Sequence, residues 1–81
     1  MRDAVIVSTA RTPIGKAYRG AFNNTTPQAL AAHAIENAVK RAGVDPAEIV
    51  DCVIGTTLQQ GHAASNIARQ AALRAGLPVS V

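Results

Sequence analysis

The chain has 81 residues, which leaves room for one domain at most. Apolar residues make up 48% of it, too many for a disordered tail, but only 2% of the residues are aromatic, so each buried side chain removes little area from water. The net charge of +3 comes from basic residues that are spread along the chain, which argues against a nucleic-acid-binding face.

The single cysteine, Cys52, excludes an internal disulfide, so nothing in the cysteine count indicates secretion. The N-terminus places Asp3 directly before a short apolar run, a pattern of neither a signal peptide nor a membrane span. We therefore expect a cytoplasmic protein without a membrane-spanning segment.

Residues 4–8 form an apolar run rich in β-branched side chains, typical of a strand that is covered on both faces in a parallel sheet. The connection that follows, residues 9–26, contains several turn formers. Its length predicts a structured functional or interface loop rather than a simple turn.

A helix start signal follows at residues 25–28, where either threonine can cap, the proline suits the first turn, and the glutamine can close a capping box. Apolar residues recur on one helical stripe up to Ala42, and Gly43 is placed to end the helix. Off that stripe, the spacing of Glu36 and Lys40 predicts a favourable ion pair.

The second half of the chain repeats this order. Residues 45–48, an acidic cap followed by proline and glutamate, predict a single helical turn. Residues 50–56 are typical of a second strand, and residues 66–75 of a second helix with an alanine-rich face. Residues 79–81 resemble the start of a third strand that is cut short.

This alternation predicts an α/β fold of βαβα order, with parallel strands, right-handed crossovers and a truncated third strand. Two parallel strands alone make a poor sheet with two open edges. We therefore interpret residues 1–81 as the opening, incomplete part of a larger layered domain that more chain, or a partner, must complete.

Two nucleotide-binding motifs are excluded. The dipeptide Gly15-Lys16 suggests a phosphate-binding loop, but that loop needs a glycine where Ala10 stands and a serine or threonine where Ala17 stands. No glycine-rich dinucleotide fingerprint follows the first predicted strand either. The interpretation that remains is a basic surface loop.

Cys52 is the only candidate nucleophile of the chain. It lies within the second predicted strand beside Asp51, where burial and a neighbouring carboxylate both disfavour the thiolate. A small core side chain is therefore the favoured interpretation.

Three further candidates carry weak signals. His33 lies on the polar face of the first predicted helix, where we expect it to be solvated. His62 lies in the loop before the second helix and is a better candidate for contact with a ligand or partner subunit, although no metal-ligand spacing surrounds it. The loop-to-helix step at Ser65 and Asn66 could present backbone N–H groups to an anion, as any helix start does.

The chain resembles the thiolases in two separated motifs. The run Arg-Thr-Pro-Ile-Gly at residues 11–15, directly after the first predicted strand, is similar to their N-terminal signature. Residues 66–73 with 75–78 resemble a helix of the same family, and residues 53–61 resemble the segment before it. The resemblance covers nearly the whole chain, and departs from the family at Ser65, where thiolases often carry glutamine.

The resemblance implies the N-terminal fragment of an acetyl-CoA acetyltransferase or 3-ketoacyl-CoA thiolase of fatty acid metabolism. Such a parent enzyme is a transferase that moves an acyl group between CoA thioesters through an acyl-cysteine. It is a dimer or tetramer with acyl-CoA as substrate and no metal or redox cofactor. Its nucleophile follows the third strand, beyond Val81, so no catalytic, cofactor-binding or metal residue is assigned here, and we expect this chain alone to be inactive.

Two alternatives stay open. One is a structural or interaction fragment without chemistry of its own. The other is a piece of a related ketoacyl-synthase-type enzyme. Residues 11–13 and 66–69 favour a thiolase over that group, because we would not expect a ketoacyl synthase to carry both motifs.

Overall fold

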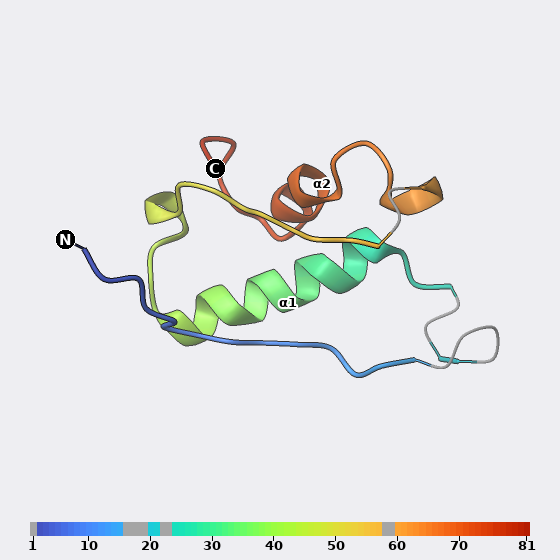
Figure 1. Cartoon of the computed structure of the whole chain (residues 1–81), viewed down its shortest axis with the longest axis horizontal. Helices are drawn as coiled ribbons and strands as arrows, with labels where there is room; N and C mark the ends of the chain where they lie inside the picture. The colour runs from blue at the N-terminus through green and yellow to red at the C-terminus, as the bar shows by residue number, and fades with distance from the viewer. Residues whose placement is uncertain (1, 16–19, 22–23, 58–59) are drawn as a thin grey trace.

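The structure is a computed structural model built from two packed helices and long extended connections (Figure 1). Helix α1 spans Pro27–Ala42 and helix α2 spans Ile67–Arg74. Two 3₁₀ turns lie between them, η1 at Pro46–Glu48 and η2 at Gly61–Ala63. The structure describes residues 2–15, 20–21, 24–57 and 60–81, the last range without the side chain of His62.

Helix α1 begins and ends where its sequence signals predict. Thr26 is the N-cap, and its hydroxyl accepts a hydrogen bond from the Ala29 N–H at 3.2 Å. Gly43 ends the helix with a φ of 70°, a left-handed conformation that costs glycine little. The predicted ion pair of Glu36 and Lys40 is confirmed at 3.2 Å between Oε1 and Nζ.

Two of the later helical elements, η1 and α2, are also capped by side chains. Asp45 accepts a hydrogen bond from the Ala47 N–H at 3.0 Å, which confirms the single turn predicted there, the 3₁₀ turn η1. Asn66 caps α2 by accepting from the Arg69 N–H at 3.3 Å, so the second predicted helix is confirmed with slightly shorter bounds.

The buried core lies between the two helices and is made of small side chains. Five apolar residues are buried: Ala32, Ile67, Ala71, Ala72 and Leu77. Because three of them are alanines, α1 and α2 can approach closely, but each contact removes little apolar area from water.

The predicted βαβα fold with parallel strands is wrong for the part of the chain that the structure describes. That part contains no strand, and residues 4–8 and 50–56 form no ladder with each other. Figure 1 shows the physical reason, since α1 lies between these two extended segments and separates their backbones. The predicted third strand at residues 79–81 belongs instead to a turn, which the Val81 N–H closes on the Pro78 carbonyl at 3.1 Å.

The β-branched side chains of the two extended segments are left in water. Val5, Ile6 and Val7 are 75%, 86% and 71% exposed, and Val50 and Val53 are 88% and 86% exposed. These segments are rich in β-branched residues, as strands are, but nothing in the described chain covers their side chains.

Candidate functional site

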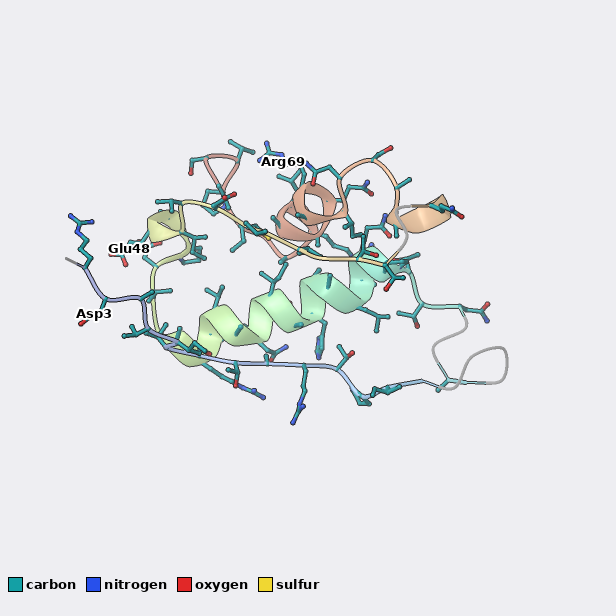
Figure 2. All side chains as sticks on the ribbon, viewed as in Figure 1. Asp3, Glu48 and Arg69 are labelled. Atoms are coloured by element: carbon teal, nitrogen blue, oxygen red, sulfur yellow. The ribbon has the colours of Figure 1, made fainter. Side chains whose placement is uncertain are left out.

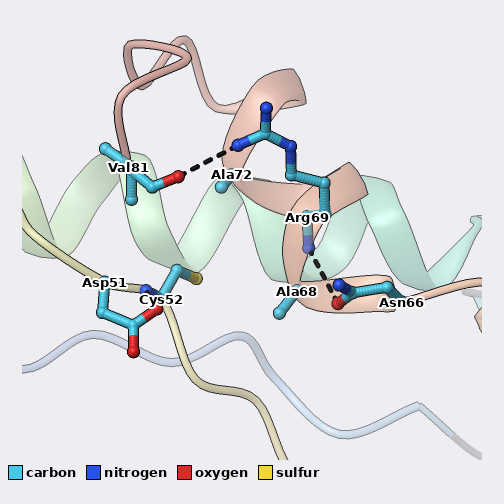
Figure 3. Close-up of a pocket in the computed structure, with 7 residues that line it drawn as sticks. All are labelled: Asp51, Cys52, Asn66, Ala68, Arg69, Ala72 and Val81. Atoms are coloured by element: carbon cyan, nitrogen blue, oxygen red, sulfur yellow. Dashed lines mark hydrogen bonds between the residues drawn. The ribbon is translucent and has the colours of Figure 1, made fainter.

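The sole cysteine lies beside a small hollow between residues 51–52 and helix α2 (Figure 3). The hollow has a volume of about 160 Å³. Its lining combines one thiol, one carboxylate and one guanidinium: Asp51, Cys52, Asn66, Ala68, Arg69, Ala72 and Val81. A thiol and a cationic side chain thus line the same hollow.

The surroundings of Cys52 keep its thiol protonated. Burial raises the pKa of Cys52 above its ordinary value of 9.0, and the neighbouring Asp51 carboxylate raises this pKa further. Asp51 also accepts a hydrogen bond from the Cys52 N–H at 2.8 Å, so the carboxylate is fixed beside the thiol. The sequence predicted both causes of the raised pKa. It also predicted a core position for the Cys52 side chain, which is only half-buried in the structure.

The guanidinium of Arg69 does not activate the thiol. Its Nη1 donates to the Val81 carbonyl at 2.9 Å (Figure 3). The same Nη1 also donates to the Val79 carbonyl at 3.4 Å. Arg69 therefore fastens the last residues of the chain to α2. No histidine stands among the described residues that line this hollow, so a general base for Cys52 is not provided there.

Sequence reasoning missed Gln70, a polar side chain that makes three hydrogen bonds. Its Nε2 donates to the carbonyls of Ala64 at 2.9 Å and Ser65 at 2.8 Å, and its Oε1 accepts from Nε2 of Gln28 at 2.7 Å. One amide thus joins α1, α2 and the loop before α2. One feature of the sequence could have identified Gln70. It is an uncharged polar residue directly before the buried Ala71 and Ala72, in the middle of a short helix.

The loop before α2 is held in an unusual backbone conformation. Ser65 and Asn66 have φ values of 59° and 58°, in the left-handed region that residues with a Cβ seldom occupy. The Asn66 side chain already satisfies the Arg69 N–H, and Gln70 binds the carbonyls before it. The anion site suggested at this helix start therefore has at least one of its donors in use.

The remaining candidates from the sequence lie apart from this hollow. His33 is exposed, as expected, and lies at the edge of a second hollow with Thr12, Pro13 and Leu30. The side chain of His62 and all of Lys16 lie outside the described residues, so their predicted roles stay predictions.

A third hollow is basic. Arg11 and Arg41 line it together with Thr9 and Ala10, and Nη1 of Arg41 donates to the Thr9 carbonyl at 3.0 Å. No acidic residue stands among the described residues that line it.

No three of the described histidine, cysteine and acidic side chains gather in a way that could hold a metal ion. Neither described helix combines the length and the apolar character that crossing a bilayer requires.

Comparison with known proteins gives a consistent family. Residues 4–81 match the model of the thiolase N-terminal domain. The chain is 43% identical over 81 residues to a 3-ketoacyl-CoA thiolase of Saccharophagus degradans, covering 99% of this chain and 21% of that protein. It is 46% identical over 74 residues to an acetyl-CoA acetyltransferase of Rhizobium meliloti, covering 91% of this chain and 18% of that protein.

A plant relative shows the same pattern. The peroxisomal 3-ketoacyl-CoA thiolase 5 of Arabidopsis thaliana is 43% identical over 79 residues, which is 98% of this chain and 17% of that protein. The chain therefore spans about a fifth of the length of the relatives it matches. Since the family match covers nearly every residue, this chain belongs to the thiolase family and corresponds to part of its N-terminal domain.

Proposed function

We propose that this chain is the N-terminal part of an acyl-CoA thiolase and serves as framework rather than as catalyst. The observation that carries the proposal is the family match over residues 4–81 together with the short share, about a fifth, of each relative's length. The parent enzyme would accept either 3-ketoacyl-CoA or acetyl-CoA substrates, since relatives of both names match.

The proposed reaction of the parent is acyl transfer through a covalent thioester. A cysteine thiolate attacks the carbonyl carbon of an acyl-CoA, the CoA thiolate leaves, and the acyl-cysteine forms. The enolate of acetyl-CoA then attacks the acyl-cysteine and releases the enzyme thiolate, or the steps run backwards as thiolysis. Donors aimed at the oxyanion would stabilise both tetrahedral intermediates. This chemistry uses acyl-CoA as substrate and needs no metal or redox cofactor.

The surroundings of Cys52 support a framework role for this chain. Its thiol has a raised pKa and lies against Asp51, whereas a thiolate nucleophile needs a lowered pKa or an adjacent base. The nucleophile of the parent would therefore come from residues outside this chain.

The proposal is tested by assaying acetoacetyl-CoA thiolysis with the purified 81-residue chain and its Cys52→Ser variant. We expect both to match the buffer blank, because neither holds an activated thiol. Turnover by the wild-type chain that Cys52→Ser abolishes would show instead that Cys52 is a nucleophile. A parent reading frame without a cysteine shortly after residue 81 would contradict the family mechanism.

Location and assembly are part of the same proposal. We place the parent in the cytoplasm as a dimer or tetramer, although two matching plant relatives are peroxisomal by name. A ketoacyl-synthase-type parent is disfavoured because the relatives compared above carry thiolase or acetyltransferase names. A purely structural fragment stays the second candidate, supported by the inert setting of Cys52.

A further inference from the structure

The residues after α2 are held to the helix by one charged side chain. Nη1 of Arg69, in the first turn of α2, donates to the Val81 carbonyl at 2.9 Å and to the Val79 carbonyl at 3.4 Å. These carbonyls lie twelve and ten residues further along the chain. Figure 3 shows the guanidinium reaching from α2 to Val81. Hydrogen bonds from an ionised donor are stronger than those between neutral groups, so this contact is well suited to fix the backbone there.

No acidic side chain of the described chain competes for the guanidinium of Arg69. Figure 2 shows Arg69 apart from the labelled acids Asp3 and Glu48. Asp51 lines the same hollow as Arg69, but no ion pair joins the two side chains among the described residues. The Arg69 side chain therefore directs its hydrogen bonds at backbone carbonyls.

The end of α2 is fixed without Arg69. The Leu77 side chain is buried, and its N–H donates to the Ala72 carbonyl at 3.1 Å. The Gly76 N–H donates to a carbonyl of the last turn of α2 at 3.1 Å, and a φ of 87° lets this glycine reverse the chain. Beyond Leu77, each described hydrogen bond to α2 comes from Arg69. Arg69 therefore sets the course of residues 79–81 but is not needed to end the helix.

The course of residues 79–81 determines where the backbone leaves α2. Val81 lines the hollow together with Asp51 and Cys52, so this point lies beside the second extended segment, residues 50–56. Under the proposed function, on which this inference rests, the nucleophilic cysteine of the parent follows Val81. A shift of Val81 is then passed along the backbone toward that cysteine.

We propose that Arg69 is a positioning residue of the parent thiolase. By holding the carbonyls of Val79 and Val81 against α2, it sets the place and the direction from which the backbone leads to the nucleophilic cysteine. Arg69 acts through this backbone and need not touch the acyl-CoA. Attack on a thioester requires a near-attack geometry, and a misplacement of about 1 Å can lower the rate about a hundredfold.

An arginine suits this role better than a lysine. The planar guanidinium carries its N–H donors in a fixed arrangement, so it can hold two carbonyls in one relative position. A lysine ammonium is a compact charge on a flexible stem and holds a backbone less rigidly. Positive charge alone would therefore not replace Arg69, which distinguishes positioning from simple electrostatic attraction.

The test compares variants of the full-length parent enzyme in acetoacetyl-CoA thiolysis. Arg69→Ala removes both hydrogen bonds, so we expect kcat to fall about tenfold to a hundredfold while the KM for acetoacetyl-CoA changes by less than about twofold. Arg69→Lys keeps the charge and should recover part of the loss. The matched control, Arg74→Ala, removes an exposed arginine of the same helix and should keep both constants within about twofold.

Alkylation of the nucleophile gives a readout that a loss of stability alone would not move. The parent is treated with iodoacetamide at a series of pH values, and the alkylated cysteine is identified by mass spectrometry of its peptide. We expect Arg69→Ala to move the pH profile of the nucleophile upward, because a displaced thiol lies farther from the groups that activate it. The profile of Arg74→Ala should match that of the wild type.

Three outcomes would overturn the inference. A wild-type parent without thiolysis activity would refute the proposed function and this inference with it. An active wild type with equal kcat values for Arg69→Ala and Arg74→Ala would refute the inference alone. The same holds if the loss in Arg69→Ala disappears when kcat is expressed per alkylatable nucleophile, because Arg69 would then only support folding. If Arg69→Ala does not fold, Arg69→Lys is compared with Arg74→Ala by the same criteria.

Discussion

At the scale of single residues, Gln70 and Cys52 play different roles. Gln70 satisfies its amide completely with three hydrogen bonds to Gln28, Ala64 and Ser65. Cys52 is half-buried beside a carboxylate and holds a proton that is hard to remove. The first organises the contact between the helices, and the second explains why the single thiol is a poor nucleophile.

Replacing Gln70 by alanine should loosen both the loop at residues 64–66 and the contact between the helices. Truncation removes one hydrogen-bond partner from each of the Ala64 and Ser65 carbonyls and from the Gln28 amide, at a cost of about 1–3 kcal/mol. We expect faster amide exchange throughout α2 and in the first turn of α1. The exposed Arg74→Ala serves as the control in the same helix. Equal exchange rates in both variants would show that the Gln70 amide contributes nothing to the fold.

The raised pKa of Cys52 predicts slow alkylation at neutral pH. Only the thiolate reacts, so the rate with iodoacetamide should rise at a higher pH than for a free cysteine. Asp51→Asn removes one of the two causes and should move the rate profile to lower pH, whereas Asp45→Asn should not. Since the pKa is raised by folding, its contribution to stability is present below the unfolded pKa and is lost as the pH rises through the folded pKa. A profile with the midpoint of a free thiol would contradict this account.

At the scale of elements, local signals decide where each helix begins and ends. Thr26, Asp45 and Asn66 cap α1, η1 and α2, and each uses its own side-chain oxygen. These bonds join residues two or three positions apart, so the sequence alone contains them. The structure was needed to choose between the adjacent threonines before α1 and to place the α2 cap at Asn66, which the sequence predicted as the first residue of that helix.

The structure assigns the α1 cap to Thr26, and adjacent substitutions can test this. Thr26→Ala removes the acceptor of the Ala29 N–H and should destabilise α1 by about 0.5–2 kcal/mol. Thr25→Ala, one residue earlier, should leave the helix content nearly unchanged. Far-UV circular dichroism at 222 nm and low temperature measures both. A larger loss for Thr25→Ala would place the cap one residue earlier.

At the scale of the whole molecule, the chain is extended for its size. Its radius of gyration is 13.8 Å, whereas a compact domain of this length has about 12 Å. Its accessible surface is 6494 Å², against about 4,600 Å² for a folded monomer of this mass. The excess matches the exposed apolar segments, so little hydrophobic free energy supports the folded state.

We therefore expect the isolated chain to be far less stable than the ~5–15 kcal/mol of ordinary domains. Heating should give a broad transition with a small heat-capacity change, because little apolar surface is exposed on unfolding. Differential scanning calorimetry on a dilute, monomeric sample measures both. A sharp transition with the enthalpy expected for 81 residues would mean that the extended segments are buried after all.

The sequence by itself determined the two helices, the glycine that ends α1, the Asp45 cap, the Glu36–Lys40 pair, the family and the setting of Cys52 beside Asp51. All of these depend on residues close together in the chain or on a recognisable motif. Only the tertiary structure decided that residues 4–8 and 50–56 form no strand ladder with each other and that Gln70 joins the helices. A strand exists only through a neighbouring backbone, and α1 separates the two segments, so their β-rich composition could predict their preference but not their pairing.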